Sequence, residues 1–102
     1  MEIIHQNKTN RFTLLFSLYI TVSGHYDLVK YLKVLAEHNG VSTRDFKSAF
    51  NYLMQECLLE SRDGEHEFFV SLTHKGIKAV EDVFVDTNKS TCYFPSYKEM
   101  QG

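Results

Sequence analysis

The sequence predicts a mainly helical domain with a small β-hairpin, an α+β fold. The expected order of elements is helix, helix, helix, strand, strand, helix, followed by a C-terminal tail. Apolar residues recur at helical spacing in four segments, which indicates four amphipathic helices. Asp63-Gly64, followed by alternating apolar and polar residues, is typical of a β-hairpin. Ser42 and Thr73 each precede a helical segment and are residue types that cap helices well.

The length and composition favour one globular domain. The chain has 102 residues, of which 43% are hydrophobic and 24% charged, enough apolar side chains for a single core. We expect residues 1–85 to form this domain and residues 86–102 to form a polar linker and an aromatic tail. The formal net charge is −2, so no overall basic field attracts nucleic acid, and DNA binding would need a local patch.

The cysteines and the apolar segments predict a soluble, cytoplasmic protein with no membrane partner. Cys57 and Cys92 belong to no Cys-x-x-Cys pair, so we expect both to be free thiols in a reducing compartment. The first residues lack the basic segment and apolar run of a signal peptide. Residues 12–22 are rich in apolar side chains, but this segment is too short to span a bilayer and is interrupted by polar residues.

Two helices are expected in the first part of the chain. The first spans about residues 9–22, and its apolar stripe consists of Phe12, Leu14, Leu15, Phe16, Leu18 and Tyr19. The width of this stripe predicts a central, largely buried helix. The second helix is expected to be capped by Asp27 and to end at His38-Asn39-Gly40. Its apolar residues are Leu28, Tyr31, Leu32 and Leu35.

The third helix is expected over residues 42–58. Ser42 and Asp45 resemble a capping box in which Asp replaces the usual Glu. The predicted buried face consists of Phe46, Ala49, Phe50, Leu53 and Met54. Helices commonly end at a glycine in the left-handed conformation. At the corresponding position this sequence has Cys57. Cys57 would cost about 1 kcal/mol if it kept that conformation, and a different helix end would change the register of the hairpin.

The hairpin is expected to turn at Asp63-Gly64, because both central positions of a type I′ turn favour positive φ angles. In the strand that follows, alternation predicts Phe69 on the outer side. The inward residues of this strand are then Phe68, Val70 and Leu72. Thr73 caps a fourth helix, whose apolar stripe consists of Ile77, Val80, Val83 and Phe84.

Three of these features resemble winged helix-turn-helix proteins. The second and third helices are joined by about four residues around Gly40, with Val41 as an apolar residue in the turn. Residues 53–60 (LMQECLLE) resemble a recognition helix that runs into the first wing strand, and residues 72–77 (LTHKGI) resemble the junction between wing and last helix. The chain looks like an uncharacterised branch of the bacterial winged-helix transcription regulators. The resemblance implies a DNA-binding homodimer that reads the major groove with helix 42–58 and dimerises through its first and last helices.

The resemblance places candidate DNA-binding residues on three elements. The outward face of the third helix should present Thr43, Arg44, Lys47, Ser48 and Asn51. Arg pairs with guanine, Asn with adenine, and Ser or Thr with phosphate oxygens or a base edge. Further contacts to phosphates are expected from Lys30 and Lys33 on the second helix and from Arg62 on the wing. Within helix 42–58 the two basic residues are balanced by Asp45 and Glu56.

The alternative is a protein-interaction module that does not bind DNA. Residues 60–67 contain four acidic side chains and one basic side chain, a net charge of −3, and a phosphate backbone would repel such a wing. The partner surface would then be the acidic wing with Phe69, or the aromatic tail with Tyr93, Phe94 and Tyr97. The tail can pack on its own domain, exchange with a twofold mate or bind another protein.

The sequence contains no recognisable catalytic or metal-binding motif. The five histidines lack the paired spacing of zinc ligands. We find no Gly-rich phosphate loop, no nucleophile elbow and no motif with paired carboxylates. A catalytic pair could be imagined in which Cys57 is the nucleophile and His66 or His74 is the base. A cysteine near the end of a buried helix, however, more often packs in the core. We expect no cofactor, no metal ion and no enzymatic activity.

Overall fold

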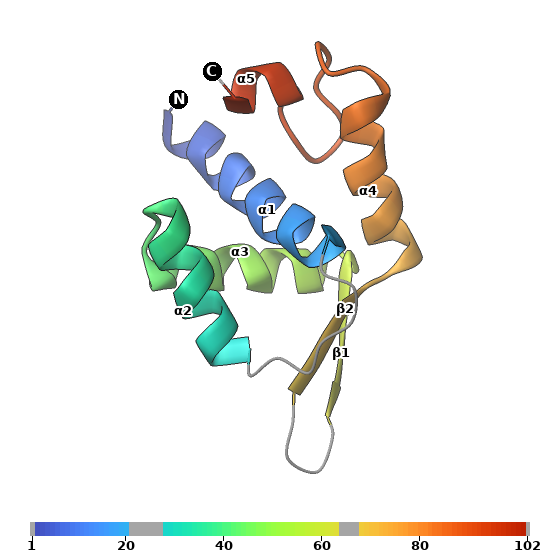
Figure 1. The fold of residues 1–102 in the computed structure, drawn as a ribbon. Coiled ribbons are helices and arrows are strands. Elements are labelled where there is room, and N and C mark those ends of the chain that lie inside the picture. Colours follow the sequence, from blue (N-terminus) through green and yellow to red (C-terminus); the bar gives the residue numbers. More distant parts are fainter. Residues whose placement is uncertain (1, 21–27, 64–67, 102) are drawn as a thin grey trace.

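The computed structural model describes residues 2–20, 28–63 and 68–101 (Figure 1). Its elements are α1 (Glu2–Ile20), α2 (Leu28–Asn39), α3 (Thr43–Gln55), β1 (Leu59–Asp63), β2 (Phe68–Leu72), α4 (His74–Val85) and α5 (Tyr97–Gln101). The described part is mainly helical with one two-stranded antiparallel sheet, which confirms the predicted α+β class. The short helix α5 was not predicted.

α1 lies in the middle of the molecule (Figure 1). α2, α3, α4 and α5 are arranged around α1, while the hairpin of β1 and β2 projects away from the helices. The hydrophobic core is built by α1, α2, α3 and α4, together with the start of β1 and Phe94 from the C-terminal segment.

α1 begins at Glu2 and not near Thr9, where the apolar pattern placed its start. Residues 2–8 are exposed and carry no continuous apolar stripe, so periodicity could not mark this part of the helix. The buried side chains of the helix include Phe12, Leu14 and Leu15, in agreement with the predicted central position. The predicted end at residue 22 lies outside the described residues. Neither α1 nor any other described helix is long and apolar enough to cross a lipid bilayer.

α2 ends in a Schellman motif formed around Gly40. Gly40 has a φ angle of 66°, a left-handed conformation that costs glycine nothing because it has no Cβ. The Val41 amide donates a hydrogen bond to the Ala36 carbonyl (2.9 Å), the bond that closes this type of helix end. Asp27, the predicted cap at the other end of α2, lies outside the described residues.

α3 begins as the sequence predicts. The hydroxyl oxygen of Ser42 accepts a hydrogen bond from the Asp45 amide at 3.1 Å, which caps the helix. The predicted buried face is confirmed for Phe46, Ala49, Phe50 and Leu53. Met54 is half-buried and packs against the core.

α3 ends at Gln55, before the predicted end at residue 58, in a second Schellman motif formed around Cys57. Cys57 has a φ angle of 62°, so it keeps the left-handed conformation usually taken by glycine. Its amide donates to the Met54 carbonyl at 3.1 Å. The Leu58 amide donates to the Leu53 carbonyl at 2.9 Å, and both leucines are fully buried. This hydrophobic contact is typical of the motif and stabilises it despite the Cβ of cysteine.

The two-residue turn predicted at Asp63-Gly64 is wrong. β1 and β2 pair antiparallel, and Asp63 lies opposite Phe68 as the last residue of β1. The observed register places the buried Leu59 opposite Leu72, which packs against the core, whereas a two-residue turn at residues 63 and 64 would have placed Leu59 opposite Phe68. The connecting residues 64–67 lie outside the described part. Val70 and Leu72 pack against the core, as predicted for the inward face.

α4 is held close to the backbone at the end of α3. Thr73 caps α4 as predicted, because its hydroxyl oxygen accepts a hydrogen bond from the Gly76 amide at 3.0 Å. The Thr73 amide donates to the Leu58 carbonyl at 3.1 Å. A Cβ atom on Gly76 would overlap with the same carbonyl oxygen, so only glycine permits this approach.

The buried stripe predicted for α4 is confirmed in part. Val80 and Val83 are fully buried, but Ile77 and Phe84 are partly exposed, with Phe84 at 41%. Gly76 and Ala79 complete the buried side. At Gly76 the absence of a side chain lets α4 approach the Leu58 carbonyl.

The C-terminal segment contributes to the core. Phe94 is only 2% exposed and belongs to the core cluster. Thr91 and Phe94 close a turn, in which the Phe94 amide donates to the Thr91 hydroxyl oxygen at 3.1 Å. The Lys98 amide of α5 donates to the Thr87 carbonyl at 3.0 Å. Residues on both sides of residue 85 thus contribute to the same core.

Replacing Cys57 by glycine is expected to stabilise the protein by about 1 kcal/mol, because glycine adopts the left-handed conformation without a steric cost. Denaturant unfolding followed by circular dichroism measures this change. Cys57→Ala is the matched control, since it removes the thiol but keeps the Cβ atom, and it should leave the free energy of unfolding nearly unchanged. Equal stabilisation of both variants would show that the thiol, and not the backbone conformation, carries the cost.

Candidate nucleic-acid interface

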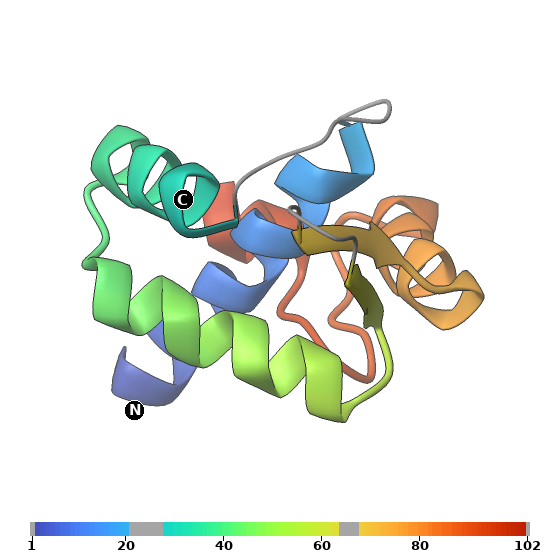
Figure 2. The same ribbon diagram turned by 90° about the horizontal axis from the view of Figure 1, so that it is seen from below.

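α3 presents one polar face to solvent. Its four buried residues turn the other side of the helix toward the core, so that α3 lies along the surface of the molecule (Figure 2). The five side chains of α3 that were predicted to contact DNA are all exposed: Thr43, Arg44, Lys47, Ser48 and Asn51. The structure brings these five residues together on the outward side of one helix.

Arg44 extends into solvent from the first turn of α3. Its side chain is 92% exposed, and its Nε atom lies 3.8 Å from an Oδ1 atom of Asp45. An ion pair at this exposure contributes little stability, so it does not fix the guanidinium in one position. Arg44 can therefore turn toward an anionic ligand at little cost.

Of the predicted DNA contacts outside α3, only Lys33 has a side chain that the structure describes. Lys33 is exposed on α2, the helix that precedes the turn into α3. The side chains of Lys30 and Arg62 lie outside the part of the chain that the structure describes. The same is true of Phe69, which was predicted on the outer face of the hairpin. Of these four side chains, only Lys33 has a described position.

Arg11 of α1 lies beside α3 and was missed as a candidate contact. Its guanidinium carbon is 3.7 Å from the centroid of the Tyr52 ring, which is a close cation–π contact. Tyr52 follows Asn51 directly and comes one helical turn after Ser48, so Arg11 adjoins the polar face of α3. The sequence contains no signal for this contact, because residues 11 and 52 meet only through the packing of α1 on α3.

The aromatic residues that were predicted as a partner surface pack against their own chain. The rings of Phe94 and Phe12 have centroids 5.3 Å apart, and those of Tyr97 and Phe84 are 5.0 Å apart. Tyr93 is half-buried, with its ring 6.2 Å from that of Phe94. Because Phe94 is buried in the core, it is not accessible to a partner in this conformation. The tail was expected to pack on its own domain, to exchange with a twofold mate or to bind another protein. In the structure it packs on its own domain.

A partly exposed seam of aromatic side chains lies between α1 and α4. This α1–α4 seam consists of Phe16, Tyr19 and Phe84. The ring of Phe16 lies between the other two, with centroids 6.4 Å from Tyr19 and 5.5 Å from Phe84. The Tyr19 hydroxyl donates a hydrogen bond to Glu81 Oε2 at 3.0 Å, which joins the two helices. This hydrogen bond and the charge of the carboxylate raise the pKa of Tyr19 above its usual value.

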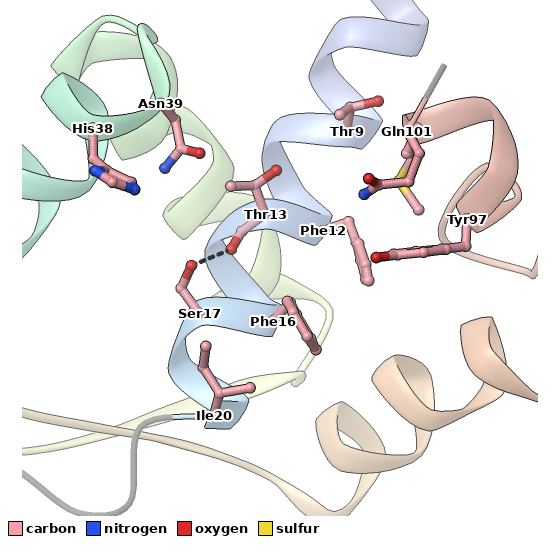
Figure 3. Close-up of a pocket in the computed structure, with 11 residues that line it drawn as sticks. Thr9, Phe12, Thr13, Phe16, Ser17, Ile20, His38, Asn39, Tyr97 and Gln101 are labelled. Carbon is pink, nitrogen blue, oxygen red and sulfur yellow. Dashed lines mark hydrogen bonds between the residues drawn. The ribbon is translucent and has the colours of Figure 1, made fainter.

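A groove of about 490 Å³ lies between α1, the end of α2 and α5 (Figure 3). Its apolar lining includes the rings of Phe12, Phe16 and Tyr97. The Ser17 hydroxyl donates to the Thr13 carbonyl at 2.7 Å on the α1 side. Among the described residues, none of the predicted DNA contacts lines this groove. The groove and the polar face of α3 are therefore separate features of the molecule.

The chain has no significant match among protein-family models, curated proteins or solved structures. Its function is therefore inferred from its own residues.

Thiols and possible metal ligands are dispersed over the described surface. Cys57 and Cys92 are both exposed and free. Within residues 2–20, 28–63 and 68–101, no three His, Cys, Asp or Glu side chains are gathered so that they could hold a metal ion. The candidate site on α3 is thus made of cationic, hydroxyl and amide side chains.

Proposed function

We propose that this chain is a winged helix-turn-helix domain that binds double-stranded DNA and acts as a homodimeric transcription regulator. The observation that carries the proposal is the exposed polar face of α3, opposite four buried residues. The short turn of residues 40–42 between α2 and α3 supports it, as does the hairpin between α3 and α4. This order of elements is the one that the sequence resemblance implies.

The dimensions and chemistry of α3 suit a helix in the major groove. Its 13 residues span about 20 Å, and a helix fits the major groove of B-DNA, which is about 12 Å wide. Arg44 would pair with guanine and Asn51 with adenine, while Ser48 would donate to a phosphate oxygen or a base edge. Lys33 on α2 would contact phosphates outside the groove.

The charge distribution predicts weak, salt-sensitive binding. The net charge of the chain is −2, and residues 60–67 carry −3, so the hairpin would be repelled by phosphates. The attraction would come from a few cations on and around α3. Each phosphate that such a cation neutralises releases counterions, which makes the affinity fall as salt is added.

Random-sequence duplex offers Arg44 no fixed guanine, so in this non-specific mode both Arg44 and Lys47 would contact phosphates. Changing the two residues together to alanine is therefore expected to weaken binding at least about tenfold at low salt, because two phosphate contacts are lost. The slope of log affinity against log salt should fall by about 1.8, at about 0.9 per phosphate. Fluorescence anisotropy with labelled duplex, titrated from low to physiological salt, measures both quantities.

The control for this experiment is Lys89→Ala with Lys98→Ala, which removes two exposed cations from the C-terminal segment. It changes the net charge by the same amount and should leave the salt slope close to that of the parent protein. If the two double variants bind equally well, α3 is not the DNA-binding surface.

The α1–α4 seam supports the homodimer. Tyr19 and Phe84 are large apolar side chains that remain partly exposed on a folded protomer. A twofold contact between two such seams would remove these rings from water, and the burial of aromatic surface is a strong source of binding energy. The first and last large helices would then form the dimer interface.

Tyr19→Lys is expected to shift the protein from dimer to monomer in sedimentation equilibrium. Lysine removes the aromatic ring but can pair with Glu81 at the same place, so the fold should be kept. Val34→Lys is the matched control, because Val34 is an exposed apolar residue on α2. A parent protein that is monomeric at all concentrations, or a Tyr19→Lys variant that dimerises as the parent does, would argue against this interface.

A protein-interaction module is the second candidate function. The acidic hairpin, with its net charge of −3, favours it because this surface attracts cationic partners and repels DNA. Absence of any salt-sensitive DNA binding by the parent protein would make this second function the preferred one.

A further inference from the structure

Arg11 is a cation held in place without being neutralised. Its guanidinium stacks on the Tyr52 ring at 3.7 Å, and an aromatic ring attracts a cation through its quadrupole while carrying no net charge. Among the described residues, the ion pairs within 4.0 Å are those of Arg44 with Asp45 and of Lys89 with Asp86. The full positive charge of Arg11 is therefore available beside α3.

The position of Tyr52 places this charge at the flank of the polar face. Tyr52 is half-buried, between the buried side of α3 and its exposed side. A helix of about 10–12 Å diameter fills a major groove of about 12 Å, so its flanks lie against the two phosphate backbones. A cation fixed at the flank of a groove-bound α3 would meet phosphate oxygens and not base edges.

We propose that Arg11 contacts a backbone phosphate on the flank of α3 and so extends the DNA interface onto α1. This inference rests on the proposed function. The guanidinium is suited to the role because its planar face can stack on a ring while its edge donates hydrogen bonds to phosphate. The contact also adds positive charge to a helix that has little of its own, since Arg44 and Lys47 against Asp45 give α3 a net charge of only +1. Lys8, exposed one turn earlier on α1, continues the same cationic side.

The test compares the salt dependence of duplex DNA binding by the parent protein, Arg11→Gln and Arg11→Lys. Random-sequence labelled duplex is the probe, and fluorescence anisotropy is the readout. Arg11→Gln should weaken binding severalfold at low salt and lower the salt slope by about 0.9, the value for one phosphate. Arg11→Lys keeps the charge and should keep most of the slope.

Lys98→Gln is the matched control, because it removes one exposed cation from α5, which lies across α1 from α3 (Figure 1). It should leave the slope unchanged. The Nε–H resonance of Arg11 in the parent protein gives a second readout that needs no variant, and it should shift when duplex is added at low salt.

Two results would overturn the proposal, and they differ in what else they exclude. If the parent protein binds DNA with a steep salt dependence, but Arg11→Gln matches Lys98→Gln and the Nε–H resonance stays in place, only the contact by Arg11 is wrong. If the parent protein shows no salt-dependent binding, the proposed function fails together with this inference.

Discussion

The fold depends on the close approach of Gly76 to the carbonyl group of Leu58. That carbonyl accepts a hydrogen bond from the Thr73 amide at 3.1 Å, and a Cβ atom on Gly76 would overlap with it. The Thr73 hydroxyl donates to the carbonyl of Cys57, and Lys75 Nζ donates to that of Glu56 at 3.1 Å. The end of α3, the base of the hairpin and the start of α4 therefore meet at one point.

This junction determines what the rest of the surface presents. Because α4 starts beside the end of α3, both helices can pack on α1, which lies between them (Figure 1). The packing of α3 on α1 buries its apolar side and leaves its polar side in solvent. The same packing brings Arg11 onto Tyr52 and leaves the α1–α4 seam exposed. The candidate DNA surface is thus a consequence of how the core is assembled.

The sequence predicts features that depend on residues close together in the chain. The caps at Ser42 and Thr73 and the exposed side chains of α3 follow from spacings of a few residues. The same spacing marks Cys57 as the end of α3 but leaves its backbone conformation open, and the structure has it left-handed. The early start of α1 has no such pattern, because residues 2–8 are exposed and carry no continuous apolar stripe. Phe94 in the core and Arg11 on Tyr52 depend on contacts between distant segments, which periodicity cannot predict.

The most direct test of the DNA-binding face is an NMR titration of the ¹⁵N-labelled protein with random-sequence duplex DNA at low salt. The account predicts that the largest amide shifts occur in residues 43–51 and that these shifts reverse as salt is added, while the amides of α5 stay in place. Shifts confined to the α1–α4 seam, or no shifts at any salt concentration, would contradict it.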